Sequence, residues 1–235
     1  MSKIFIDDCN LSNIEELLQW GCFEGVTTNQ GIFNKEQQER KKLGHPPCNF
    51  EDHAKKILKL SNHLPVSLEG PNDINGLLEK AKLYASWGTN AVIKIPMLSN
   101  GDGLKVVTLL EDAICTNVTA CMSINQAYLA INAGASYVSL FYNRMKDWNH
   151  TDAAEQYALE TIKTVQRLCN ESGYTELIIG SIRSPDDIEK IITVCTDIIT
   201  IPTKILRQMP QNDMTDKTLK EFDDAWIEFC KGEKK

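Results

Sequence analysis

Short apolar runs alternate with longer amphipathic stretches along almost the whole chain, and this alternation limits the possible folds more than any other feature. Eight runs have the length of buried strands, and they centre on residues 3–7, 25–28, 65–69, 90–95, 114–119, 137–141, 176–181 and 198–201. Such alternation favours parallel strands joined by right-handed helical crossovers. Eight units in 235 residues predict a single domain, residues 1–235, folded as a closed (β/α)8 TIM barrel.

An open, doubly wound sheet is the structural alternative to the barrel. The chain has neither a G-x-G-x-x-G nor a P-loop pattern, so nothing supports a nucleotide-binding sheet. Several helix starts are marked in the sequence. Ser12 with Glu15 and Ser123 with Gln126 fit the capping box, and Ser184 precedes a proline and two acids.

Two segments fall outside the regular strand–helix alternation. Residues 35–50 are polar and contain glycine and proline, which predicts a loop insertion after the second strand. Residues 217–230 predict an extra amphipathic helix, because Phe222, Trp226 and Phe229 fall on one of its faces. Two interpretations of this helix stay open: it packs on its own barrel, or it forms a subunit contact.

Charge and hydropathy exclude several classes of function. The net charge of −7 argues against a nucleic-acid-binding surface, although it permits a small anionic substrate. No run approaches the roughly 18 apolar residues of a membrane span, and the N-terminus reaches Asp7 too soon for a signal peptide. We therefore expect a cytoplasmic protein that binds neither nucleic acid nor a membrane.

Cysteine and histidine spacing indicates no metal site. The eight cysteines are spread from Cys9 to Cys230 without a C-x-x-C pair, which favours reduced structural thiols over disulfides or metal ligands. The four histidines follow no metal-binding spacing, and we expect His53 and His63 on a solvated helix face.

Polar residues recur on the inward face of the predicted strands, near the carboxyl ends. Successive strand residues point to opposite faces, and the face toward the helices must be apolar, so the polar residues point into the barrel. Active sites of TIM barrels lie at the carboxyl ends of the strands. A catalytic rim is therefore predicted, with a network of satisfied buried salt bridges as the alternative. This parity places the following side chains inside: Asp7, Glu69, Lys94, Asn117, Thr119, Ser139, Phe141, Ser181 and Arg183.

Lys94 is the natural nucleophile of this set, because its apolar strand keeps the amine away from water. Burial and a nearby cation such as Arg144 or Arg183 would favour the neutral amine, which attacks carbonyl carbons. Asp7 and Glu69 supply two carboxylates able to move protons.

Hydroxyl, amide and guanidinium groups complete the predicted rim. Asn117 and Thr119 can hold a substrate hydroxyl or a catalytic water. Arg144, Ser181 and Arg183 form a set of donors suited to a tetrahedral oxyanion.

The sequence resembles the small transaldolase / fructose-6-phosphate aldolase family from about residue 4 to residue 206. A series of short motifs follows the family's order and spacing: FID at 5–7, GVTTN at 25–29, VSLE at 66–69, VIKIP at 92–96, TNVT at 116–119, AGASYVS at 133–139, Arg144, SIR at 181–183 and ITIP at 199–202. The resemblance implies a class I aldol mechanism that uses neither a metal nor an organic cofactor.

In that mechanism Lys94 forms a Schiff base with the ketone of a ketose phosphate, and Asp7 takes a proton from the hydroxyl beside the breaking bond. Glu69 and Thr119 position a water. The dihydroxyacetone unit then passes to an acceptor such as erythrose 4-phosphate, a reaction of the pentose phosphate pathway. The residues implied to bind substrate are Thr28, Asn29, Asn117, Ser139 and Phe141, with Arg144, Ser181 and Arg183 on the phosphate.

Two positions separate the branches of the family. Aldolase-type members carry glutamine where this chain has Glu69 and tyrosine where it has Phe141. Both residues favour group transfer, a transaldolase, over the alternative, a fructose-6-phosphate aldolase that releases free dihydroxyacetone. A barrel that only binds sugar phosphates is the non-enzymatic alternative.

The chain departs from the family pattern near the rim. Gln30 replaces a usual proline, Asp8 a common threonine, and Gly70 and Gly180 replace residues with side chains. These differences keep a sulfonated sugar such as sulfofructose open as substrate. Family members form pentamers or decamers with exchanged C-terminal helices, so the resemblance also implies a homo-oligomer.

Overall fold

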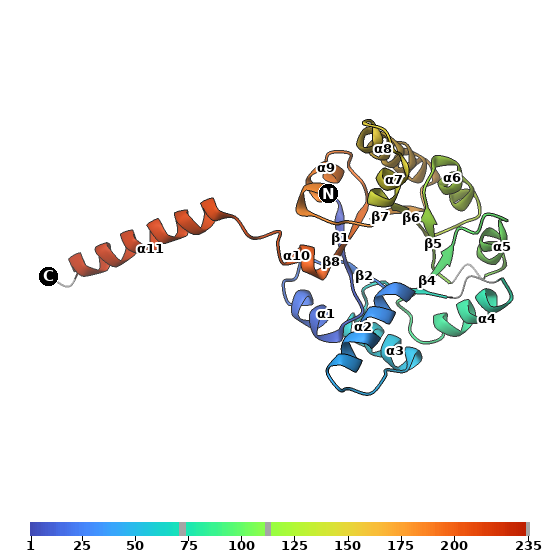
Figure 1. The fold of residues 1–235 in the computed structure, drawn as a ribbon, viewed down its shortest axis with the longest axis horizontal. Coiled ribbons are helices and arrows are strands. Elements are labelled where there is room, and N and C mark those ends of the chain that lie inside the picture. Colours follow the sequence, from blue (N-terminus) through green and yellow to red (C-terminus); the bar gives the residue numbers. More distant parts are fainter. Residues whose placement is uncertain (71–73, 111–113, 234–235) are drawn as a thin grey trace.

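Eight parallel strands close into a barrel with helices around it, as the alternation predicts (Figure 1). The computed structural model describes residues 1–70, 74–110 and 114–233. The strands are β1 Lys3–Asp7, β2 Gly25–Thr27, β3 Val66–Glu69, β4 Ala91–Pro96, β5 Thr116–Cys121, β6 Tyr137–Phe141, β7 Glu176–Gly180 and β8 Ile198–Pro202. Strand β8 pairs in parallel with β1 and completes the ring. The (β/α)8 TIM-barrel prediction is confirmed.

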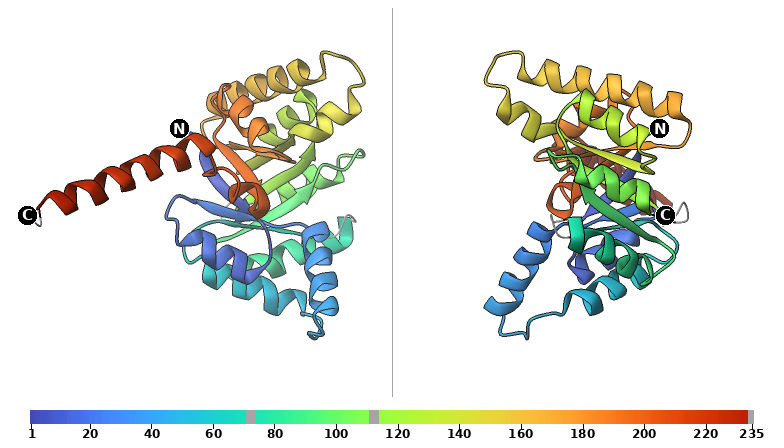
Figure 2. Two further views of the ribbon diagram at one scale, coloured as in Figure 1. Left: turned by 60° about the vertical axis from the view of Figure 1, so that its left-hand side comes forward. Right: turned by 90° about the vertical axis from the view of Figure 1, so that its right-hand side faces the viewer.

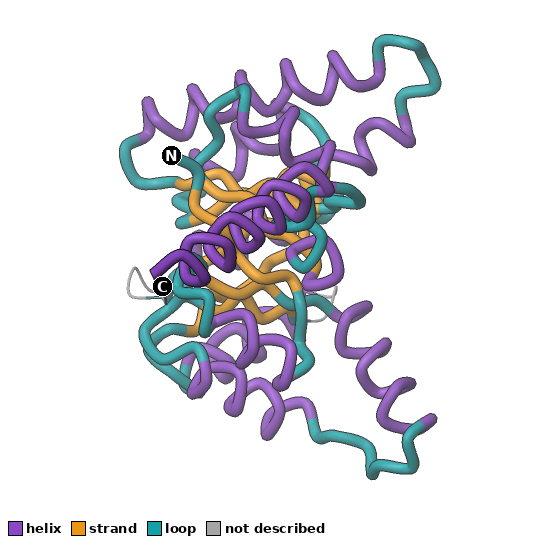
Figure 3. Tube along the Cα trace, turned by 90° about the vertical axis from the view of Figure 1, so that its left-hand side faces the viewer, coloured by secondary structure: helices purple, strands orange, loops and turns teal. Residues whose placement is uncertain are grey.

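Helices follow every strand and cover the outside of the barrel, whose strands lie in the interior (Figure 3). They are α1 Leu11–Leu18, α2 Gln30–Lys42, α3 Phe50–Leu60, α4 Ile74–Ala85, α5 Asp102–Leu109, α6 Ile124–Asn132, α7 Tyr142–Trp148, α8 Ala154–Ser172, α9 Pro185–Ile192, α10 Thr203–Leu206 and α11 Asp213–Glu233. None of the helices in the described part of the chain is long and apolar enough to cross a membrane.

The amino-terminal half of the barrel interior is filled by apolar side chains. Phe5, Ile178 and Ile198 form a small buried cluster, separate from the larger core between barrel and helices. A Cβ at Gly25 would lie 2.5 Å from the ring of Phe5, so only glycine leaves room for that ring. This apolar cluster fills the amino-terminal end of the barrel interior, and the polar inward-facing side chains lie at the carboxyl ends of the strands.

Residues 35–50 are mostly helical, so the prediction of a loop insertion is wrong. Helix α2 runs on to Lys42, and only residues 43–49 connect it to α3. Asn29 and Asn49 cap the two helices by accepting hydrogen bonds from Ile32 N and Asp52 N. Only Glu36 of α2 is buried, and a helix this polar has no apolar stripe for a sequence pattern to detect.

Two further local predictions are corrected by the structure. His53 is buried, and its Nε2 lies 2.7 Å from Cys9 O. His63 is exposed as expected, but it lies in the turn after α3 and not on a helix. Helix α1 is capped by Asn10, whose side chain accepts from Asn13 N, so Ser12 is not a cap. The caps at Ser123 and Ser184 are confirmed. Gln126 does not complete a capping box with Ser123, because its side chain accepts from Met122 N.

Helix α11 leaves the barrel and extends away from it (Figures 1 and 2). Its aromatic side chains Phe222, Trp226 and Phe229 are exposed, with Trp226 and Phe229 stacked on each other. The interpretation in which this helix packs on its own barrel is therefore wrong.

The carboxylate of Asp8, just after β1, connects this segment to α1 and to α10, the helix that follows β8. Its Oδ2 accepts hydrogen bonds from Asn13 Nδ2 at 2.8 Å and Thr203 Oγ1 at 2.7 Å, and its Oδ1 accepts from two backbone N–H groups. One side chain thus joins β1, α1 and α10. The aspartate at position 8 therefore stabilises the packing of the first and last segments of the barrel against each other.

Replacing Asp8 should therefore destabilise the fold. We expect Asp8→Ala to lower the free energy of unfolding by about 2–3 kcal/mol, because several donors lose an ionised acceptor. Urea denaturation followed by circular dichroism measures this. Asp152→Ala, at an exposed position, is the matched control, and equal midpoints for the two variants would contradict the assignment.

Candidate active site

A cavity of about 680 Å³ opens at the carboxyl ends of the strands. Parallel strands bring their carboxyl ends to one rim of a barrel, which is where TIM-barrel sites lie. Eight of the twelve sequence-predicted site residues line this cavity: Asp7, Asn29, Lys94, Ser139, Phe141, Arg144, Ser181 and Arg183. The other four, Thr28, Glu69, Asn117 and Thr119, are not among the residues that line it, although Thr28 and Glu69 contact Lys94.

Lys94 is buried near the end of β4, and its side chain is 6% exposed. Its Nζ donates to Thr28 O at 2.9 Å and lies 3.1 Å from Glu69 Oε2. The register pairs Glu69 of β3 with Lys94 of β4, which brings the two charges together. The amine thus contacts two hydrogen-bond acceptors, one of which is the Glu69 carboxylate.

Asp7 ends β1 and faces the same cavity as Lys94. Its Oδ1 accepts a hydrogen bond from Thr27 Oγ1 at 2.8 Å, and Thr27 Oγ1 also contacts the hydroxyl of Thr200. Burial raises the pKa of Asp7 above its usual value, although Lys94 and the Thr27 hydroxyl act against that shift. A carboxyl with a raised pKa in a cleft is suited to proton transfer.

A chain of hydrogen bonds crosses the barrel behind the cavity. Ser139 Oγ donates to Asn117 Oδ1 at 2.7 Å, and Asn117 Nδ2 donates to Ser67 Oγ at 3.3 Å. The chain links β6, β5 and β3, so Asn117 orients Ser139 from behind.

The two threonines that do not line the cavity differ in their contacts. The hydroxyl of Thr28 donates to Ser67 O at 2.8 Å, so only the backbone of Thr28 meets Lys94. Thr119 Oγ1 is buried and has no hydrogen-bond partner within the described residues. Buried hydroxyls are normally paired, so this group is available to a water or a substrate.

Two arginines and a serine meet at the outer part of the cavity. The guanidinium of Arg144 lies 5.6 Å from the ring centre of Phe141. Ser181 has a left-handed backbone (φ +64°), and its carbonyl accepts from Asn143 Nδ2. Strained residues of this kind concentrate at functional sites. The buried Asp187 holds the following loop by accepting from Arg183 N and Ser184 N.

Arg183 forms a two-point salt bridge with Asp147, with Nη1 lying 2.9 Å from Oδ1 and Nη2 also in contact. Asp147 was not predicted from the sequence, because it lies on a helix, where strand parity does not apply. Sequence analysis also missed Thr27 and Thr200, which line the cavity and lie within recognised motifs. The parity rule, applied to β2 and β8, could have found these two.

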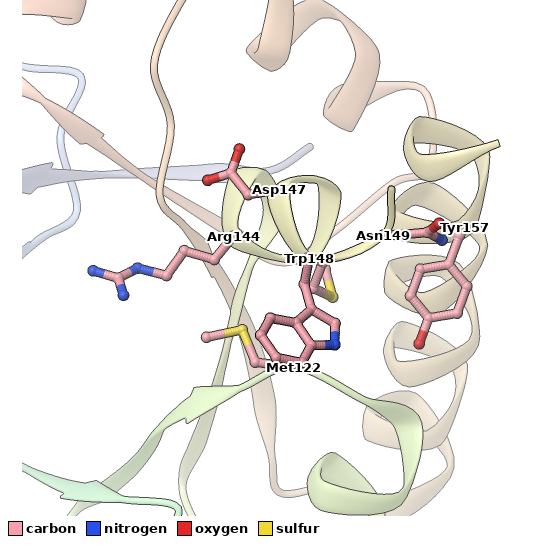
Figure 4. Close-up of a pocket in the computed structure, with 7 residues that line it drawn as sticks. Met122, Arg144, Asp147, Trp148, Asn149 and Tyr157 are labelled. Atoms are coloured by element: carbon pink, nitrogen blue, oxygen red, sulfur yellow. The ribbon is translucent and has the colours of Figure 1, made fainter. Parts of the chain in front are cut away.

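A second hollow of about 640 Å³ adjoins the first on the side of α7 and α8. It is lined by Met122, Trp148 and Tyr157, with Arg144 and Asp147 common to both hollows. In Figure 4 the guanidinium of Arg144 points away from Trp148. Arg144 therefore forms part of the wall between the two hollows.

Metal-ligating residues do not gather anywhere in the described part of the chain: no group of three or more His, Cys, Asp or Glu side chains could hold an ion. All eight cysteines are free. The chemistry available in the cavity is that of an amine, carboxyls, hydroxyls and guanidinium groups.

Comparison with known proteins identifies the family. The sequence model of the family described as Transaldolase/Fructose-6-phosphate aldolase matches residues 4–231. A probable transaldolase of Aquifex aeolicus is 37% identical over 226 residues, covering 95% of this chain and 96% of the relative. A probable transaldolase of Thermoplasma acidophilum is 34% identical over 226 residues, with 95% of both chains covered.

A solved structure supports the fold alone. Thiamine phosphate pyrophosphorylase from Pyrococcus furiosus superimposes with a TM-score of 0.57 at 11% identity, covering 89% of this chain and 93% of that one. The family match spans nearly the whole chain, and it includes the strands that carry Asp7, Glu69 and Lys94. The chain therefore belongs to the transaldolase/fructose-6-phosphate aldolase family.

Proposed function

We propose that this chain is a class I transaldolase that carries a dihydroxyacetone unit on Lys94. The observation that carries the proposal is a buried amine 3.1 Å from the Glu69 carboxylate, in a cavity that also holds Asp7. Only a neutral amine attacks a carbonyl, and Glu69 is within reach of the proton that the ammonium group must lose. No metal ion or organic cofactor takes part in this scheme.

The reaction begins when Nζ of Lys94 adds to the ketone carbon of a ketose phosphate. Loss of water, which Glu69 and the unpaired hydroxyl of Thr119 would manage, gives the Schiff base. Asp7 then removes the proton of the hydroxyl beside the breaking carbon–carbon bond, and an aldehyde leaves. The bond's electrons remain on the three-carbon unit as an enamine, which adds to an acceptor aldehyde while Asp7 returns the proton. Water then hydrolyses the new Schiff base, which releases the product ketose and restores the amine of Lys94.

The remaining predicted residues would bind the sugar. Arg144, Ser181 and Arg183 would hold the phosphate at the outer part of the cavity, because cationic and hydroxyl donors suit its oxygens. Asn29 and Ser139 would hold donor hydroxyls, and Phe141 would line the wall beside them. Asn117 would act through Ser139, to which it is hydrogen bonded, and Thr28 through the backbone carbonyl that contacts Lys94.

Covalent trapping tests the Schiff base directly. Borohydride added with fructose 6-phosphate should leave a reduced three-carbon adduct on Lys94, found by peptide mass spectrometry. Lys94→Met should lose both adduct and activity while keeping its circular dichroism spectrum, and Lys163→Met, at an exposed lysine, should keep both. An adduct on any other lysine, or none at all, would overturn the mechanism.

An aldolase that releases free dihydroxyacetone is the second candidate. Glu69 and Phe141 occupy the two positions that separate it from a transaldolase. Phe141 lines the cavity, and a phenyl ring, unlike a phenol, cannot donate a proton for release of the bound enamine. Phe141 therefore favours transfer to an acceptor.

Exchanging these two residues tests the branch. Fructose 6-phosphate should turn over only when an aldose phosphate acceptor is present. The double variant Glu69→Gln/Phe141→Tyr should raise acceptor-free release of dihydroxyacetone by roughly tenfold or more, since a positioned acid contributes factors of this size. Unchanged acceptor-free release in a folded double variant would contradict the branch assignment.

We also propose that the chain forms a homo-oligomer through α11, as a pentamer or decamer. The helix stands away from the barrel with Phe222, Trp226 and Phe229 exposed (Figure 1), and an apolar face of this kind is stabilised by burial. Light scattering on the full chain should give a mass of five or ten subunits. A monomer at micromolar concentration would contradict this.

A further inference from the structure

One face of α2 lies over the candidate active-site cavity. Gly31, Ile32 and Lys35 all line the cavity, and their spacing puts them on one side of the helix. The two views of Figure 2 show α2 (blue) and α7 (yellow-green) at the same end of the barrel, on opposite sides. Lys35 and Arg144 therefore approach the cavity from two different helices.

The rotation of α2 about its axis is fixed by contacts at three positions. Asn29 caps the helix, and Gln30 Nε2 donates to Gly70 O at the end of β3. The buried carboxylate of Glu36 accepts from Asn10 Nδ2 at 3.0 Å. Successive helix residues are rotated by about 100°. With Glu36 turned toward Asn10, Lys35 lies on the neighbouring face of the helix, which lines the cavity.

The cations around the cavity differ in how they are paired. Arg183 is engaged by Asp147 through both terminal nitrogens. Within the described residues, neither Lys35 nor Arg144 forms a salt bridge with a carboxylate, although both line the cavity. In a chain of net charge −7, two unpaired cations at one cavity attract an anion from both sides.

We infer that Lys35 is a further substrate-binding residue, which holds the anionic tail of the sugar together with Arg144. This inference rests on the proposed function, and it goes beyond the Arg144, Ser181 and Arg183 set that the family resemblance implies. The tail is a tetrahedral oxyanion, phosphate or sulfonate. It bridges the two free cations, while Asp147 keeps Arg183 partly neutralised.

Lys35 also acts on Asp7 through space. The charged groups that face Asp7 are Lys94 from β4, Lys35 from α2 and its own neighbour Asp8, with Thr27 donating a hydrogen bond. The positive charge of Lys35 lowers the pKa of Asp7, against the larger effect of burial. Removing that charge should therefore move the acid limb of the kcat/KM profile to higher pH.

Three donor sugars that differ only in the tail test whether Lys35 binds an anionic tail: fructose 6-phosphate, its 6-sulfonate counterpart and fructose. Lys35→Met should raise KM about tenfold for the anionic donor or donors that the wild type accepts, a factor typical of a lost charged contact. KM for fructose should stay within about twofold when all three donors are assayed at a pH above the acid limb, where Asp7 is ionised in both proteins. Lys35→Arg should return KM for the anionic donors most of the way to the wild-type value.

Lys41→Met is the matched control. It makes the same charge change on the same helix outside the cavity, and it should behave as wild type.

Equal KM values for Lys35→Met and wild type with the anionic donors would overturn the inference, as would an equal rise in KM for all three donors. Borohydride trapping on Lys94 is run in parallel with each variant. If wild type forms no adduct with any donor, the proposed function is overturned and this inference with it. If the adduct forms normally and only the tail dependence is absent, the proposed function stands and the assignment of Lys35 is wrong.

Discussion

The contact between Lys94 and Glu69 is the interaction on which the rest of the site depends. Two opposite charges lie within the barrel wall, held 3.1 Å apart by the pairing of β3 with β4. Burying either charge alone is costly, and breaking such a pair typically costs about 3–5 kcal/mol. The barrel tolerates these groups because each neutralises the other, so a reactive amine can be kept away from bulk water.

The fold followed from the alternation of apolar runs with amphipathic stretches, and the inward-facing residues followed from strand parity. Phe5 fills the barrel floor and Asp7, two residues further along β1, reaches the cavity, because inward positions recur with a period of two. Parity fixes the direction of a side chain but not its partner. Parity therefore turned Lys94 and Glu69 inward but did not pair them, and the structure places Glu69 and Thr28 O beside the amine.

Residues contributed by helices were harder to predict. Asp147 and Lys35 lie on α7 and α2 and carry no strand alternation. The second half of α2 was assigned to a loop over residues 35–50, because that stretch is polar and contains glycine and proline. What positions it is a set of individual hydrogen bonds, such as Gln30 to Gly70 O and Asn10 to Glu36. These long-range contacts depend on the closed barrel and have no local sequence pattern.

The backbone at Ser181 has a consequence for attempts to engineer this protein. A residue with a side chain pays about 1–2 kcal/mol for a left-handed conformation, a cost from which glycine is exempt. A screen for thermal tolerance alone would therefore select glycine at this position. The selected enzyme would melt at a higher temperature and would lack a hydroxyl at the rim, so stability screens should be coupled to turnover.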